Sequence, residues 1–121
     1  MNKYFLASIF LAIALVLAGC GSKETPAVDR SAGIIFFYGR ECPHCKIVED
    51  YIKENKISEK IAFAQGEVYH NKSNAEFMVE KAKQCGINTE EGLGVPFLWA
   101  EGKCMIGQEQ AIQFFKDKAG S

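Results

Sequence analysis

The sequence predicts an α/β protein built on a four-stranded mixed sheet that is flanked by helices. A strand–helix–strand pattern over residues 33–69 implies two parallel strands joined by a right-handed crossover. Two short strands at 96–100 and 103–106 are joined by Glu101-Gly102, a two-residue hairpin turn with glycine where a positive φ is needed. The expected order is therefore strand, helix, strand, helix, strand, strand, helix.

The first strand is expected at 34–38, an uninterrupted apolar run between Gly33 and Gly39 that is typical of strands buried on both faces. Apolar residues then recur at helical spacing over 45–57. A second strand is expected within 61–69, where Gly66 interrupts the apolar pattern.

The second half of the chain continues the alternation. The capping-box pattern Ser73-Asn74-Ala75-Glu76 opens a helix that Gly86 is well placed to close. Residues 87–94 form a loop, and a last helix is expected over 108–118. Six aromatic residues are assigned to the core: Phe36, Phe37, Phe97, Trp99, Phe114 and Phe115.

The N-terminal segment has a different composition. Lys3 precedes an uncharged, largely apolar run over residues 4–18, which is the pattern of a secretory signal peptide and is shorter than the ~20 residues of a spanning helix. Leu17-Ala18-Gly19-Cys20 resembles the lipobox of bacterial lipoproteins, which implies cleavage before Cys20 and lipid on its sulfur. The alternatives are an uncleaved membrane anchor and an unmodified or disulfide-bonded Cys20.

These features predict three segments: a cleaved signal at 1–19, the lipidated cysteine with a flexible tether at 20–32, and one folded domain at 33–121. A chain of 121 residues with a net charge of -1 suits one domain, expected to be monomeric, and argues against binding to nucleic acid. Of five cysteines, a lipidated Cys20 leaves four, which can pair twice in an oxidising compartment.

The motif Cys42-Pro43-His44-Cys45 follows the first strand and opens the first helix. The helix N-terminus stabilises a Cys42 thiolate, Pro43 suits the first helical turn, and His44 can offer the sulfur a hydrogen bond or positive charge. An exposed Cys42 is expected to be the nucleophile, and a buried Cys45 to resolve the mixed disulfide. Half of a zinc site and a purely structural disulfide are the alternatives.

Two separated motifs resemble the thioredoxin superfamily in its compact, glutaredoxin-like form. The first is Tyr38-Gly39-Arg40-Glu41 with the Cys-Pro-His-Cys that follows it, and the second is Gly94-Val95-Pro96. The resemblance implies that Pro96 is cis and faces the disulfide, and that Val95 offers its backbone to a substrate strand. No dissociable cofactor is then needed, because the disulfide is the redox centre.

The Cys-Pro-His-Cys sequence with Val95-Pro96 is similar to the DsbA-type oxidants, which implies a direction toward oxidation or isomerisation. Glu41 beside Cys42 opposes a thiolate, and Arg40 offsets part of that effect. The strand at 34–38 carries no carboxylate that could relay a proton.

Cys85 and Cys104 are expected to form a structural disulfide at the end of the sheet far from Cys42. Two free thiols or a second redox pair are the alternatives. His70, in a loop, is expected to be solvated.

Together these observations predict a thiol–disulfide oxidoreductase that lipid anchors outside the cytoplasm. Its expected substrates are the thiols and disulfides of exported proteins, and a membrane or soluble redox partner is expected to regenerate it. In lipoproteins of Gram-negative bacteria, aspartate after the lipidated cysteine often marks retention in the inner membrane. Because Gly21 follows Cys20 here, the outer membrane is the expected site in a host that has one. A dedicated thiol reductant and a metal chaperone using Cys42, His44 and Cys45 are the alternatives.

Overall fold

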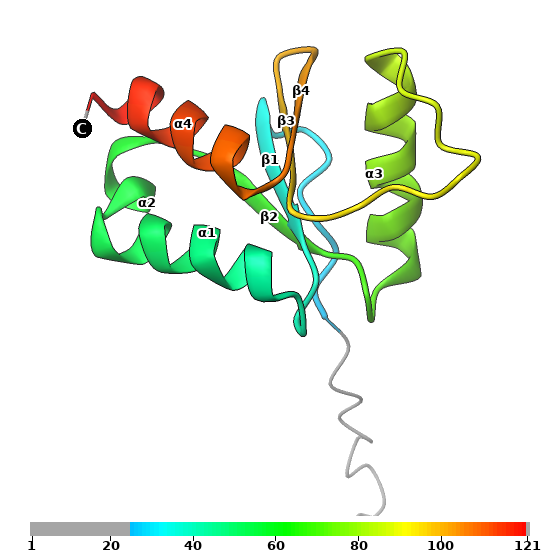
Figure 1. Ribbon diagram of the computed structural model, residues 1–121, viewed down its shortest axis with the longest axis horizontal. Coiled ribbons are helices and arrows are strands. Elements are labelled where there is room, and N and C mark those ends of the chain that lie inside the picture. The colour runs from blue at the N-terminus through cyan, green and yellow to red at the C-terminus, as the bar shows by residue number, and fades with distance from the viewer. Residues whose placement is uncertain (1–24, 121) are drawn as a thin grey trace, which may run out of the picture.

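A four-stranded sheet in the order β2-β1-β3-β4 organises the computed structural model, which describes residues 25–120 (Figure 1). β1 pairs parallel with β2 and antiparallel with β3, which pairs antiparallel with β4. The predicted four-stranded mixed sheet with flanking helices is confirmed. The expected signal peptide and Cys20 lie outside the described residues. The strands are β1 Ile34–Tyr38, β2 Ala64–Glu67, β3 Phe97–Ala100 and β4 Lys103–Ile106.

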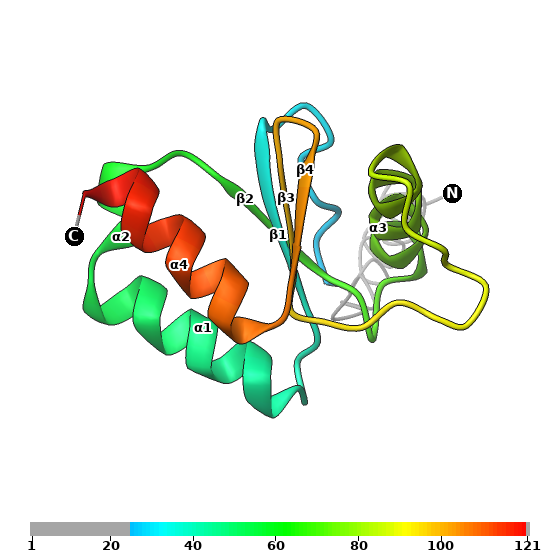
Figure 2. The ribbon, with the colours of Figure 1, turned by 45° about the horizontal axis from the view of Figure 1, so that its top comes forward.

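Helices cover both faces of this sheet. α1 and α4 lie side by side on one face, and α3 lies alone on the other (Figure 2). Among residues 25–120, no helix is both long and apolar enough to span a bilayer. The helices are α1 Pro43–Glu54, α2 Ile57–Lys60, α3 Lys72–Gln84 and α4 Gln108–Ala119.

The helix predicted over 45–57 is in fact two helices. α1 ends at its C-cap Asn55, and Lys56 adopts a left-handed conformation with φ 52° before the short α2 begins. Ile52 before this break and Ile57 after it are both buried. The apolar periodicity therefore continues through the break, and the sequence pattern does not reveal it. β2 covers only Ala64–Glu67, so it is shorter than the segment 61–69 within which the sequence placed it.

The start of α3 differs from the prediction as well. Asn71, not Ser73, is the N-cap, and its side chain accepts a hydrogen bond from the Asn74 N–H at 3.0 Å. Asparagine at this position satisfies one of the free N–H groups of the first turn, as the expected serine would have done. The helix closes as predicted, with Gly86 at φ 75°.

The alternation of side chains along β1 divides the core into two layers. Phe36 packs with Leu98 and Phe115 beneath α1 and α4, whereas Phe37 packs with Phe77 and others beneath α3. Of the six aromatic residues assigned to the core, four are fully buried, and the other two are partly buried against the same layers. The fully buried ones are Phe36, Phe37, Phe97 and Phe115, and the partly buried ones are Trp99 and Phe114.

The prediction of a flexible tether at 20–32 is wrong for residues 25–32, which pack against the α3 side of the sheet. Val28 is only 7% exposed, and its N–H donates to the buried Asn74 Oδ1 at 2.9 Å. The Arg30 guanidinium lies 4.5 Å from the centre of the Phe77 ring. The polar composition of this segment concealed one buried valine and its hydrogen-bonding partner. The fold therefore begins before residue 33.

Cys85 and Cys104 form a disulfide, as predicted, with their Cα atoms 6.2 Å apart. The bond joins the C-terminal end of α3 to the edge strand β4. Trp99 on β3 is directly paired with Cys104 across the strands. This disulfide lies toward the β3–β4 turn, whereas the N-terminal end of α1 lies at the other end of the sheet (Figure 1).

Candidate active site

Cys42 and Cys45 lie where β1 passes into α1. A short turn follows β1, in which the Cys42 N–H donates to the Gly39 carbonyl at 3.1 Å. Cys42 is the N-cap of α1, with φ -89° and ψ 113°, and Pro43 opens the helix, where its missing N–H removes no intrahelical hydrogen bond. The two cysteines are disulfide-bonded, with Cα atoms 5.2 Å apart.

The local field favours negative charge on the Cys42 sulfur. The Cys45 N–H points at Cys42 Sγ from 3.1 Å, in the manner of a helix-capping hydrogen bond. No acidic residue occupies the first turn of α1, so the positive end of the helix dipole is unopposed there. A thiolate formed on Cys42 by reduction would accept this hydrogen bond and become a better nucleophile and leaving group.

The two sulfurs differ less in exposure than the sequence led us to expect. Cys45 is fully buried, as predicted, but Cys42 is only 6% exposed, so the expectation of an exposed Cys42 is wrong for this oxidised form. The cause is the loop before β3, because the Val95 carbonyl oxygen lies 3.7 Å from Cys42 Sγ. A partner must therefore approach Cys42 alongside Val95.

The Val95-Pro96 peptide bond is cis, as predicted, and Pro96 is buried. The Gly107 N–H donates to the Pro96 carbonyl at 2.9 Å and fixes this loop against the start of α4. An open groove of about 400 Å³ runs beside it, between the N-terminal ends of α1 and α4. Its lining includes His44, Val95, Pro96 and Gln108. The groove is bordered by Val95, whose carbonyl oxygen lies next to Cys42 Sγ.

His44 does not hydrogen-bond the sulfur, contrary to one of the roles expected for it. Its Nδ1 is instead hydrogen-bonded to Gln108 Oε1 at 2.6 Å, at the N-terminal end of α4. The Cys45 N–H already occupies the direction from which a hydrogen bond would reach Cys42 Sγ. His44 therefore lines the groove and is held at its edge by Gln108.

Sequence reasoning missed a buried carboxylate beside this site. Glu67, at the end of β2, is 2% exposed and accepts hydrogen bonds from the N–H groups of Arg40, Tyr69 and His70 at 3.1, 3.0 and 2.8 Å. Burial alone would raise the pKa of the Glu67 carboxyl, but these donors and nearby His70 together hold its pKa below the usual range. Its position at the carboxyl end of the strand parallel to β1 was the available signal, because such ends meet at one edge of a sheet.

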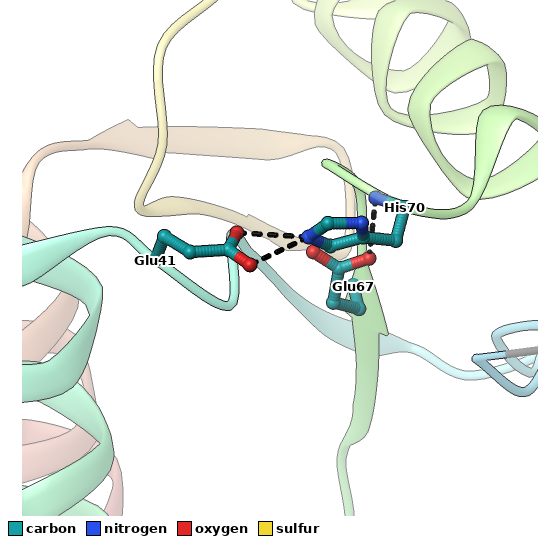
Figure 3. Close-up of side chains that lie close together, drawn as sticks. All are labelled: Glu41, Glu67 and His70. Carbon is teal, nitrogen blue, oxygen red and sulfur yellow. Dashed lines mark hydrogen bonds and ion pairs between the residues drawn. The ribbon is translucent and has the colours of Figure 1, made fainter. Parts of the chain in front are cut away.

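His70 is paired rather than solvated, which corrects the expectation. Its Nε2 lies 2.7 and 2.9 Å from the two carboxylate oxygens of Glu41 (Figure 3). The ligand-type atoms of Glu41, Glu67 and His70 all lie within 4.8 Å of one another, and imidazole with carboxylates suits a transition metal. Each of these groups already has a hydrogen-bonding partner in the protein, however. The three residues therefore act first as a link between the two loops.

No family model and no curated protein matches the chain. Among solved structures, the chain is similar to oxidised glutaredoxin 2 from Chlamydomonas reinhardtii, with a TM-score of 0.48, 16% identity and coverage of 74% of this chain and 84% of that one. It is also similar to the holo form of glutaredoxin C1 from Populus tremula x tremuloides, with a TM-score of 0.48, 17% identity and coverage of 74% and 88%.

Proposed function

We propose that this protein is a lipid-anchored thiol–disulfide oxidoreductase outside the cytoplasm that exchanges disulfides with exported proteins, chiefly in the direction of oxidation or isomerisation. The observation that carries the proposal is the Cys45 N–H directed at Cys42 Sγ, at a helix N-terminus beside the cis Val95-Pro96 bond. This arrangement stabilises the charged form of one cysteine of a bonded pair and leaves a groove leading to it.

The proposed reaction needs only the two cysteines and a partner. In oxidation, a partner thiolate attacks Cys42 Sγ, the Cys42–Cys45 bond breaks, and the electron pair leaves on Cys45, which takes up a proton. A second partner thiolate then attacks the sulfur bonded to Cys42 and releases the Cys42 thiolate together with the oxidised partner. The net transfer is two electrons from the partner dithiol to the cysteine pair, which ends with one proton on Cys45 and a thiolate on Cys42, while the partner's other proton goes to the solvent.

The direction follows from which form of the pair the site stabilises. A low-energy Cys42 thiolate stabilises the reduced enzyme, and a stable reduced form makes the disulfide a stronger oxidant. The exposed ends of the groove then favour partners that present an extended segment. The metal-chaperone alternative is weakened because His44 is hydrogen-bonded to Gln108 rather than converging with the cysteines.

The reduction potential tests both the activity and its direction. The full chain is equilibrated in glutathione redox buffers, and the Cys42–Cys45 bond is followed by alkylation and mass spectrometry. We expect a potential between about -180 and -120 mV, the range of known disulfide isomerases and oxidants. A value near -270 mV, which is typical of thioredoxin, would assign a dedicated reductant instead. Failure to equilibrate with glutathione would contradict a thiol-exchange function.

The proposed anchor would hold the active site near the bilayer. The Thr25 carbonyl accepts a hydrogen bond from Asn71 Nδ2 at 2.9 Å, and the adjacent His70 contacts Glu41 beside Cys42. Five residue steps from Cys20 to Thr25 span at most ~18 Å. The partner proteins are then those whose thiols emerge at the membrane surface.

Replacing Cys20 by serine should abolish both processing and acylation in a bacterial host, because lipid can be attached only to the thiol. Intact-mass analysis should show the wild-type protein beginning at Cys20 with added acyl chains, and the variant retaining residues 1–19 without them. Lys23→Ser, a neighbouring change that leaves Cys20 in place, should be processed normally. If neither the wild-type nor the Lys23→Ser protein carried acyl chains, the anchor would be removed from the proposal.

A further inference from the structure

The loop that carries Cys42 is attached to the end of β2 by three contacts. The Val68 N–H donates to the Tyr38 carbonyl at 2.9 Å, and the Arg40 N–H donates to Glu67 Oε1 at 3.1 Å. Glu41, the residue before Cys42, pairs with His70. The first two contacts hold the backbone, whereas the third brings two charged groups together beside the reactive cysteine.

The buried Glu67 carboxylate fixes the geometry of the third contact. It accepts hydrogen bonds from the backbone on both sides, from Arg40 in the first loop and from Tyr69 in the second. The His70 N–H also donates to it (Figure 3). The backbones of Glu41 and His70 are thereby held next to each other, so their side chains meet without ordering a mobile segment. The pair is formed before any partner arrives.

The charge on this pair affects Cys42. A carboxylate on the adjacent residue disfavours a second negative charge on the sulfur, and a cation at hydrogen-bonding distance from that carboxylate cancels the effect. His70 Nε2 approaches both oxygens of Glu41, so the protonated imidazole neutralises the carboxylate directly.

We propose that His70 is a positioning residue for Cys42, and that its imidazolium neutralises Glu41 and so favours the Cys42 thiolate. The inference rests on the proposed function, because the thiolate matters only if Cys42 exchanges disulfides. The Glu41–His70 pair carries no net charge when His70 is protonated and one negative charge when it is neutral.

Other charged and titratable groups of the described residues lie near this pair. The groups near the pair or on the same loops are Arg40, Glu67, Tyr69 and Lys72, with His44 on the far side of Cys42.

The test measures the ionisation of the Cys42 thiol directly. The reduced full chain is alkylated with iodoacetamide over a range of pH, and the rate at Cys42 is obtained from fragment-ion mass spectrometry. At a pH where Cys42 is partly ionised, we expect His70→Gln to slow alkylation about two- to threefold, a modest effect because both partners are half-exposed and screened. His70→Lys, which keeps a positive charge, should restore the wild-type rate.

A double-mutant cycle decides whether His70 acts through Glu41. Adding Glu41→Gln to the slow His70→Gln variant should restore the wild-type rate, because no unneutralised carboxylate is then left beside Cys42. Lys83→Gln, which removes an exposed positive charge at the far end of α3, should match the wild type. All effects should shrink in 1 M salt and should be the same with and without EDTA.

Several results would overturn the inference. These are a wild-type rate for His70→Gln, a slow rate for His70→Lys, a double variant that stays as slow as His70→Gln, or a dependence on EDTA that reveals a bound metal in place of the ion pair. Far-UV circular dichroism checks that each variant is folded. Alkylation needs no disulfide partner, so the inference can hold even if the glutathione equilibration shows that the proposed function is wrong.

Discussion

Replacing Cys42 by serine should abolish disulfide exchange completely, whereas replacing Cys45 by alanine should stop the reaction half-way. Serine cannot form a disulfide, so no mixed intermediate exists without the Cys42 sulfur. With Cys45→Ala, Cys42 keeps its place at the helix N-terminus and still attacks a partner, but no second thiol releases it. Non-reducing electrophoresis with mass spectrometry should show partner proteins covalently bound to Cys42 in the Cys45→Ala variant alone.

The control for this pair is Lys46→Ala, a change at the next, exposed position of α1 that leaves both sulfurs in place. It should exchange disulfides at close to the wild-type rate and accumulate no mixed disulfide. If Cys42→Ala with Cys45 intact trapped partners equally well, Cys45 would be the attacking residue. The roles drawn from burial and from the Cys45 N–H would then be reversed.

Removing the Cys85–Cys104 disulfide should lower the free energy of unfolding by about 3 kcal/mol. The bond joins residues 19 apart in sequence, and a closed loop of roughly this size reduces the entropy of the unfolded chain by that amount. For a domain of this size the loss corresponds to a decrease in Tm of about 12–24 °C. Urea unfolding of oxidised Cys85→Ala/Cys104→Ala against wild type measures it.

Lys83→Ala/Lys103→Ala is the matched control, because it changes two exposed residues on the same helix and strand and leaves the disulfide intact. Each lysine change should alter stability by no more than about 0.5 kcal/mol. The Cys85→Ala/Cys104→Ala variant should also retain the exchange activity of Cys42, since this disulfide lies toward the other end of the sheet. A loss of activity in the folded variant would support a second redox pair.

The features that the sequence predicted well are those encoded by neighbouring residues. The apolar run of β1, the Glu101-Gly102 turn and the Cys42–Cys45 motif each depend on a few consecutive positions, and the structure confirms all three as local features. The pairing of Cys85 with Cys104 also followed, because the order of elements fixes which ends of a small sheet lie together.

The features that the sequence did not predict depend on contacts between distant segments. The burial of Glu67 results from backbone N–H groups of two different loops, and nothing in its own neighbourhood indicates them. His70 is 29 residues from Glu41, and a histidine in a polar loop has no local pattern that predicts such a partner. The order of residues 25–32 likewise depends on Asn74, which lies 46 residues beyond Val28.

The placement of the single tryptophan gives the protein an optical reporter. Trp99 is paired with Cys104 across β3 and β4, and a disulfide in near contact with an indole quenches its fluorescence. Light emission from Trp99 therefore depends on whether Cys85 and Cys104 are bonded. The Cys42–Cys45 bond lies at the start of α1, on the other face of the sheet, so Trp99 emission should report on the Cys85–Cys104 bond and not on the active-site pair.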